Sequence, residues 1–323
     1  MHDQPNYRIG ISQAEKSCVK LCSHFKNWSP RTNERAFTFT ELLVVVLTII
    51  LLAFVLLPAH AGSRAKSESV RCMDNLREIM RAVMLYTRDN HDLFPPNEDS
   101  SSGPPGHVWV PGNAGLGSTE QFNPDNLADP NFCGITTYLN TNVSLFRCPT
   151  DLRVGTYQGA DPTKLGTKVP AARSISMNQA VGTICPGFNS GNGHSGKPIF
   201  SVNGPWLDNF HSHIRNRPWR TYGKVSETVI PGPARLWVII EEDVYSLNEG
   251  SLAVGMNMAE WIDFPATRHA MSCNISFADG HVELHKWVNQ TTRMVGALVP
   301  RKAIVGDKTD WLWLAERTSA RAQ

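Results

Sequence analysis

The sequence lacks several features that would assign a common function class. The 323-residue chain has no CxxC pair, which counts against a zinc ribbon or a thioredoxin-type motif. Its formal net charge is only +2 and no long run of like charge appears, so we expect no nucleic-acid partner. Seven cysteines, spread along the chain, are too few for a fold built on disulfides. No internal repeat occurs, which excludes solenoids and propellers.

The sequence also lacks a recognisable catalytic pattern. No Ser or Cys stands in a nucleophile elbow or a triad context. The stretch Gly191-x4-Gly196-Lys197 imitates a phosphate-binding loop, but Pro198 occupies the position where Ser or Thr would bind magnesium. We therefore predict that the protein is not an enzyme and has no organic cofactor.

One apolar run dominates the N-terminal part. Residues 42–59 carry no charged side chain, and as a helix they would span about 27 Å, close to the hydrocarbon thickness of a bilayer. The first 36 residues contain six Lys or Arg against three Asp or Glu, which favours a cytoplasmic N-terminus. We predict a single-pass membrane protein, in contact with lipid, whose C-terminal part lies outside the cytoplasm. One or two disulfides would be compatible with that location.

Glu41 stands directly before the apolar run. A carboxylate there is costly unless it lies at the interface or has a cationic partner. One interpretation is an interfacial acid near a helix N-terminus, where the helix dipole favours it. The other is a functional role, and its neighbours in the sequence favour this one.

Residues 35–45, RAFTFTELLVV, resemble the cleavage and methylation motif of type IV prepilins and type II secretion pseudopilins. The resemblance implies that prepilin peptidase removes residues 1–36 by cutting between Ala36 and Phe37 and then methylates the Phe37 amine. Ala36 stands where the family usually has Gly. Glu41 would meet the N-terminal amine of a neighbouring subunit, and Pro58 is similar to the proline that loosens such helices.

A second match lies near the C-terminus. His269 is followed by nine residues and then by Asp279-Gly280, which resembles the H-X9-DG element of large prepilin-like families. Shorter pieces, CMDNLREIMRAV at 72–83 and FRCPTD at 146–151, are also similar to that family. The resemblance therefore touches most of the chain beyond residue 35. It implies a protein of the bacterial inner membrane whose C-terminal domain is periplasmic or extracellular.

The remaining pattern predicts an α+β, pilin-like fold. Residues 37–94 read as one long N-terminal helix, transmembrane over 42–59 and then amphipathic, and residues 95–323 as an extracytoplasmic β-rich domain with long loops. We expect the helix to pack on a mostly antiparallel sheet. Four segments are strand candidates, and Asp279-Gly280 joins the last two in a tight hairpin: 174–178, 236–241, 274–278 and 282–287.

Three polar groupings could have a specific role. Glu241, Glu242 and Asp243 follow an apolar strand and, with Asp279, could bind Ca²⁺, although such acidic loops are usually only solvated. A second grouping places His281, Glu283 and His285 on one strand face, where with His269 they could bind a metal; a solvent-facing polar row explains the same alternation, and we favour it. In a third interpretation, His269 and Asp279 hydrogen-bond across the end of a strand.

Two functional hypotheses follow. The first is a structural subunit of a type II secretion pseudopilus or type IV pilus-like filament, whose partners are prepilin peptidase, other pilin or pseudopilin subunits and an inner-membrane assembly platform. The alternative is an uncleaved, membrane-anchored domain that binds a ligand such as a glycan through loop tryptophans. The candidates for that role are Trp109, Trp206, Trp219 and Trp261.

Overall fold

The chain divides into two compact units, residues 1–59 and 60–323, with the boundary inside a helix. The computed structural model describes residues 37–97, 99, 108–184, 200–294 and 301–322. Helix α1 runs from Phe39 to Asp89, and the side chains of its residues 53–66 lie outside this description. The two units are considered separately below.

In the first unit, α1 begins with a capping box. Thr38 precedes the helix, its backbone N–H donates to Glu41 Oε2 at 2.9 Å, and the Glu41 N–H donates to Thr38 Oγ1 at 3.3 Å. This reciprocal pairing satisfies two of the backbone donors that every helix start leaves free. After it, the large apolar side chains up to Leu52 are all 43–61% exposed: Leu42, Leu43, Val44, Val45, Val46, Leu47, Ile49, Ile50, Leu51 and Leu52.

The predicted fold class is wrong. The chain is mixed α/β, with a β-rich sheet domain and mainly short helices, and not a pilin-like fold with a transmembrane first half. In the part of the chain that the structure describes, no helix combines the length and the hydropathy that crossing a bilayer requires.

The second unit is built on a five-stranded sheet of order β10-β9-β6-β3-β7. Only the β3–β7 pair is parallel, so the sheet is mixed. The three central strands are completely buried, which is why their sequences are apolar or small and polar on both faces. The strands are β3 (Ile175–Asn178), β6 (Trp237–Glu241), β7 (Ser251–Leu252), β9 (Ser272–Phe277) and β10 (Val282–Lys286).

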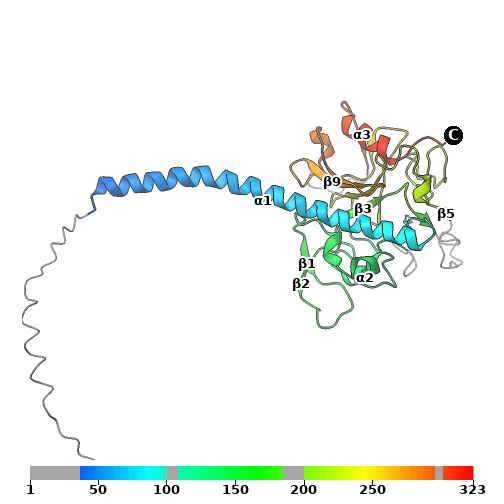
Figure 1. Cartoon of the computed structure of the whole chain (residues 1–323), viewed down its shortest axis with the longest axis horizontal. Helices are drawn as coiled ribbons and strands as arrows, with labels where there is room; N and C mark the ends of the chain where they lie inside the picture. The colour runs from blue at the N-terminus through cyan, green and yellow to red at the C-terminus, as the bar shows by residue number, and fades with distance from the viewer. Residues whose placement is uncertain (1–36, 98, 100–107, 185–199, 295–300, 323) are drawn as a thin grey trace, which may run out of the picture. The chain divides into compact units, whose positions relative to one another are not determined.

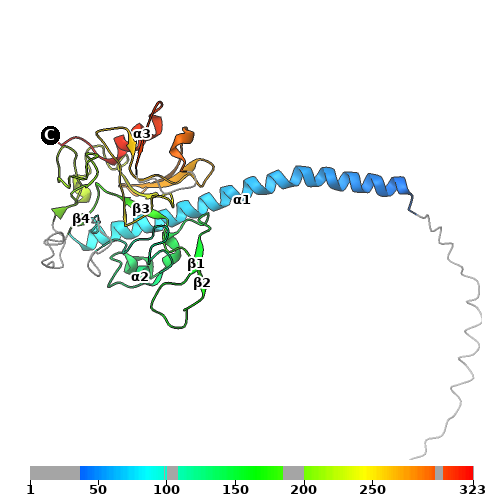
Figure 2. The same ribbon diagram turned by 180° about the vertical axis from the view of Figure 1, so that it is seen from behind.

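The part of α1 in this unit belongs to the core. Its apolar residues recur at helical spacing and are at most 1% exposed, whereas charged side chains of the same stretch, such as Arg77, Glu78 and Arg81, face solvent. Figures 1 and 2 show this segment, in cyan, between the sheet and α3 on one side and the β1–β2 pair and α2 on the other. The buried residues are Cys72, Leu76, Ile79, Met80, Ala82 and Val83.

Short elements complete the domain. The β9–β10 hairpin turns at Asp279-Gly280, where Gly280 has φ +92°, a conformation that favours glycine. The helices are α2 (Asp125–Ala128), α3 (Thr309–Thr318) and the 3-10 turns η1 (Thr136–Leu139), η2 (Val143–Phe146), η4 (Val225–Glu227) and η5 (Gln290–Thr292). The two-stranded pairs are β1–β2 (Val154–Thr156, Lys168–Pro170), β4–β5 (Thr183–Ile184, Phe200–Ser201) and β8–β11 (Glu260–Trp261, Lys302–Ala303).

Candidate metal centre

Four ligand-type side chains from four different segments meet inside the sheet domain. Cys72 lies on α1, Cys148 in the loop after η2, Glu241 at the end of β6 and His269 in the turn before β9. Cys72, Cys148 and Glu241 are 0% exposed, and His269 is 8% exposed. Their ligand atoms all lie within 4.8 Å of one another. We call this group the Cys–Glu–His cluster.

Short contacts connect the members of the cluster. Cys72 Sγ donates to Glu241 Oε1 at 2.8 Å, and His269 Nε2 lies 3.2 Å from the same oxygen. Cys148 Sγ lies 3.3 Å from His269 Nε2. The second carboxylate oxygen, Oε2, accepts from the backbone N–H of Asn274 at 2.6 Å and from its side-chain amide at 3.1 Å. The two oxygens of Glu241 are thus divided: one faces the cluster and the other is held by Asn274.

Local backbone geometry aims His269 at the cluster. The two residues after it, Ala270 and Met271, have φ of 55° and 63°, so the chain turns sharply in the left-handed region before β9 starts. The His269 N–H donates to Ser272 O at 3.2 Å and closes the turn. Glu241 is placed by its strand, because β6 pairs with β3 on one side and β9 on the other.

Electrostatics in the cluster follow from burial and these contacts. Burial raises the pKa of Cys72 well above its usual range. The hydrogen bond from Cys72 lowers the pKa of Cys148 to about 6, although burial opposes the change. Burial alone would raise the pKa of Glu241, but the hydrogen bond and the charge of His269 bring it down to about 2. Burial alone would lower the pKa of His269, but its contacts with Cys148 and Glu241 raise it to about 10. The pKa values of neighbouring side chains in the cluster are therefore shifted in opposite directions, in an interior that excludes water.

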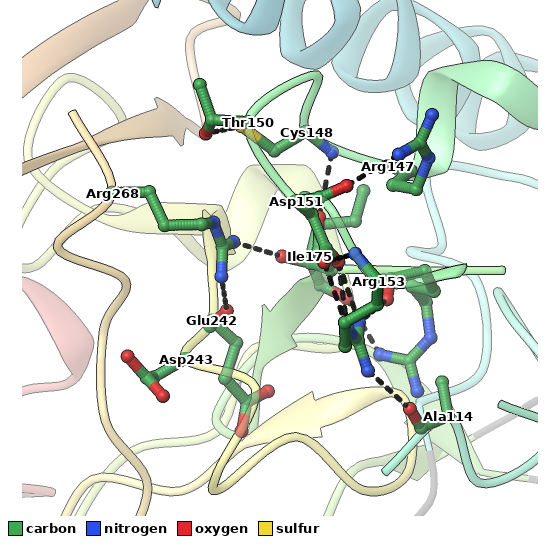
Figure 3. A network of polar contacts seen from close by, with 12 residues as sticks. Ala114, Arg147, Cys148, Thr150, Asp151, Arg153, Ile175, Glu242, Asp243 and Arg268 are labelled. Atoms are coloured by element: carbon green, nitrogen blue, oxygen red, sulfur yellow. Dashed lines mark hydrogen bonds and ion pairs between the residues drawn. The ribbon is translucent and has the colours of Figure 1, made fainter. Parts of the chain in front are cut away.

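A buried network of polar contacts borders the cluster (Figure 3). The guanidinium of Arg268 donates to the backbone oxygens of Glu242 at 3.0 Å and Ser174 at 3.3 Å. Cys148 itself contacts Thr150 Oγ1 at 3.0 Å. Burial raises the pKa of Glu242 to about 8, and its carboxyl contacts the hydroxyls of Ser176 and Ser246. The network thus places the guanidinium of Arg268 beside the cluster.

The arrangement suits metal binding better than covalent catalysis. A thiol next to an imidazole resembles an activated nucleophile, but Cys148 has no exposed surface, so no substrate carbonyl could reach its sulfur. A mixed set of sulfur, nitrogen and oxygen ligands is the kind that binds zinc. An apolar cavity of about 360 Å³ adjoins His269, the one member of the cluster that lines it; Val70, Met73, Thr150 and Leu284 also line it.

The predicted calcium residues do not come together. Glu241 and Glu242 point to opposite sides of the chain, as successive residues of an extended strand must, toward His269 and toward Ser246 respectively. The Asp243 carboxylate accepts from the Tyr245 N–H, whereas Asp279 lies at the hairpin turn and contacts its neighbour His281 at 2.6 Å. The four carboxylates thus have separate partners.

The predicted contact between His269 and Asp279 is also absent from the structure. The six-residue strand β9 separates the two, so they lie at its opposite ends. His281 stacks on Phe277, and His285 stacks on Trp313 of α3 with ring centroids 3.5 Å apart. The polar row of β10 is therefore partly covered by α3, and it forms no ligand group with His269 in the described structure.

The residues predicted for processing and assembly are only partly described. Ala36 lies outside the described residues, and the side chain of Pro58 does too, although α1 continues through it. Phe37 is 68% exposed and Glu41 lies in the first turn of α1. Neither observation tests cleavage or assembly.

Cysteine and tryptophan side chains can be compared with the sequence-based expectations. Cys72, Cys133, Cys148 and Cys273 are all free and buried, so the described cysteines form no disulfide. Of the four tryptophans proposed for ligand stacking, Trp109 and Trp261 are buried in the core. Trp206 stacks on His211, next to a second group of ligand-type side chains made of Asp99, His211 and His213.

Sequence reasoning missed the Cys–Glu–His cluster as a unit. The sequence alone assigns no specific role to Cys72 or Cys148. A signal existed, because Cys72, Cys148 and His269 lie in the three segments that carry the resemblance beyond the N-terminus. A search for Cys and His shared by those segments would have grouped them.

Comparison of the chain with known proteins gives no further assignment: no family model, no curated protein and no solved structure matches it.

Proposed function

We propose that this chain is a prepilin-like structural subunit, processed by prepilin peptidase and assembled with other copies into a type II secretion pseudopilus or type IV pilus-like filament. The observation that carries the proposal is the apolar segment of α1 up to Leu52, whose large side chains are exposed in the described structure and which the lone acid Glu41 precedes. Contiguous exposed apolar surface of this kind marks an interaction site.

The arrangement of the segment supports self-association. Its apolar side chains surround the helix on all sides, so a single neighbour could not cover them and several helices are needed. The partner we infer is the same segment of further copies of this chain. Glu41 is the only charged residue between Phe37 and Leu52, and a carboxylate in such a bundle requires a cation.

Processing would supply that cation. Cleavage between Ala36 and Phe37 creates a new amine four positions before Glu41, and the amine of one subunit would pair with Glu41 of the next. An ion pair of this kind in a low-dielectric bundle is directional and would set the register between subunits. The sheet domain, whose core contains the second part of α1, would form the surface of the filament.

N-terminal mass spectrometry of the chain from its native cell tests processing. The expected result is a chain that begins at methylated Phe37. An intact 1–36 segment would instead favour the tethered ligand-binding alternative, which the burial of Trp109 and Trp261 does not support. The inner-membrane location stays a prediction, and fractionation of the same cells would test it.

A matched pair of variants tests assembly. Glu41→Ala and Glu78→Ala each remove one exposed acid from α1. Both variants should be processed and keep the unfolding temperature of the parent, but only Glu41→Ala should fail to enter filaments pelleted from cells. Normal incorporation of Glu41→Ala would remove the proposed role of this acid.

A further inference from the structure

We propose that Cys72, Cys148, Glu241 and His269 bind one zinc ion, which fastens the buried part of α1 to the sheet and to two loops. This inference goes beyond the proposed filament function and does not depend on it. Each of the four side chains comes from a different segment, with Cys72 and Glu241 separated by 169 positions. An ion bound there would join all four segments at one point.

The spacing of the ligand atoms is close to that of a tetrahedral site. Zinc–ligand bonds of about 2.0–2.3 Å place neighbouring ligands of a tetrahedron about 3.3–3.8 Å apart. The His269 Nε2–Glu241 Oε1 and Cys148 Sγ–His269 Nε2 distances are 3.2 and 3.3 Å. The Cys72 Sγ–Glu241 Oε1 distance of 2.8 Å must lengthen by roughly 0.7 Å, a change that a side-chain torsion can supply.

Groups around the cluster hold one of its four ligands in place. The Asn274 N–H and amide hold Glu241 Oε2 at 2.6 and 3.1 Å and leave Oε1 directed at the cluster. Groups of this kind orient metal ligands and tune their affinity. All four ligands are buried, so the site has the closed, four-ligand form of a structural zinc centre and no free position for a substrate.

The charges of a zinc-loaded cluster are balanced. Zinc binds cysteine as thiolate and histidine as neutral imidazole, so the ligands would be two thiolates, a carboxylate and an imidazole, with three negative charges. A zinc ion supplies two positive charges and the guanidinium of Arg268, next to the cluster, supplies a third. Any proton on Cys72 Sγ, Cys148 Sγ or His269 Nε2 is lost when the bond to zinc forms, and it passes to solvent.

Other occupants fit less well. Calcium and magnesium take oxygen ligands, and only one of the four ligand atoms is an oxygen. A bond between the two sulfurs would be a disulfide instead of a metal site, and it would leave Glu241 and His269 without their sulfur partners.

Metal analysis of the purified full-length chain, kept reduced in mild detergent, tests the proposal. We expect about one zinc per chain, and the chelated chain should regain that zinc and unfold at a higher temperature when zinc is added. Cobalt added in place of zinc should give the charge-transfer absorption of a cobalt–thiolate centre. This band reports the sulfur ligands directly, without any variant.

Matched serine variants locate the site. Cys148→Ser should lose at least tenfold in zinc affinity, while Cys133→Ser, at a buried free cysteine that contacts Trp109 O instead, should retain it. Asn274→Ala should weaken zinc binding about 10–100-fold while it leaves all four ligands in place. If Cys148→Ser does not fold, the cobalt spectrum of the parent decides.

Two results would overturn the proposal. One is a parent chain that takes up no zinc or cobalt while both thiols react with a thiol reagent after unfolding. The other is a native mass lower by two hydrogen atoms that requires reductant to restore and that maps to Cys72 and Cys148, which would identify a disulfide between them. Neither result bears on processing at Phe37, so failure here is distinguishable from failure of the proposed function.

Discussion

The packing of α1 against the sheet predicts a large difference between two identical substitutions on the same helix. Val83 is 0% exposed and Val70 is 47% exposed. Val83→Ala removes two methyl groups from the core, a loss of about 1.6 kcal/mol at about 0.8 kcal/mol per group, and the remaining cavity adds roughly 0.5–1 kcal/mol. Val70→Ala should cost about half the transfer energy and leave no cavity.

The intrinsic helix preference cancels in this comparison, because Val→Ala gains the same small propensity at both positions. The free energy of unfolding should therefore differ between the variants by about 1.5 kcal/mol. In a domain of this size that difference corresponds to roughly 3–6 °C in the unfolding temperature. The full-length chain in mild detergent, followed by far-UV circular dichroism, supplies the measurement for both variants.

The reasoning is falsified if the two variants unfold at the same temperature. Equal values would mean that Val83 gains nothing from the core and that this part of α1 is not an integral part of the sheet domain. A loss in Val83→Ala much above about 3 kcal/mol would instead indicate that the surroundings collapse, and near-UV circular dichroism of the core tryptophans would then change too.

Two further predictions concern the C-terminal part. Burial lowers the pKa of His285 to about 4, so the folded state holds it neutral while the unfolded state takes up a proton below its usual pKa of 6.5. The free energy of unfolding should therefore decrease as pH falls from 6.5 to about 4, and His285→Phe, which keeps an aromatic ring on Trp313, should reduce that slope in denaturant titrations. The buried carboxylate of Asp310 accepts from the N–H groups of Val288 and Asn289 and from the Thr292 hydroxyl. Asp310→Ala should cost about 2–4 kcal/mol in thermal unfolding, and a cost under about 0.5 kcal/mol would contradict this account.

Four of the five strands of the sheet could be predicted from the sequence. The four strand candidates coincide with β3, β6, β9 and β10, because short apolar runs bounded by turn residues have few other interpretations. The Asp279-Gly280 hairpin was confirmed for a simple reason: glycine readily adopts the positive φ that the turn requires. The short β7, with its parallel pairing to β3, carries no comparable signal.

The fold class and the site could not be obtained in the same way. A long uncharged run predicts a membrane span from length alone, and the described part of α1 does not meet that condition. The Cys–Glu–His cluster joins residues 28 to 197 positions apart, and no local period links them. The calcium prediction grouped Glu241 with Glu242 because they are adjacent in sequence, although strand geometry directs neighbours to opposite sides.

The C-terminal helix α3 has a consequence for synthesis of the protein. Thr318, at its end, accepts from the side chains of Asn178 and Trp237 on the two central strands β3 and β6. The middle of the sheet therefore remains incomplete until α3 has left the ribosome, although β3 emerged long before. The apolar strands stay uncovered during that time, so we expect chaperones to bind the chain during translation.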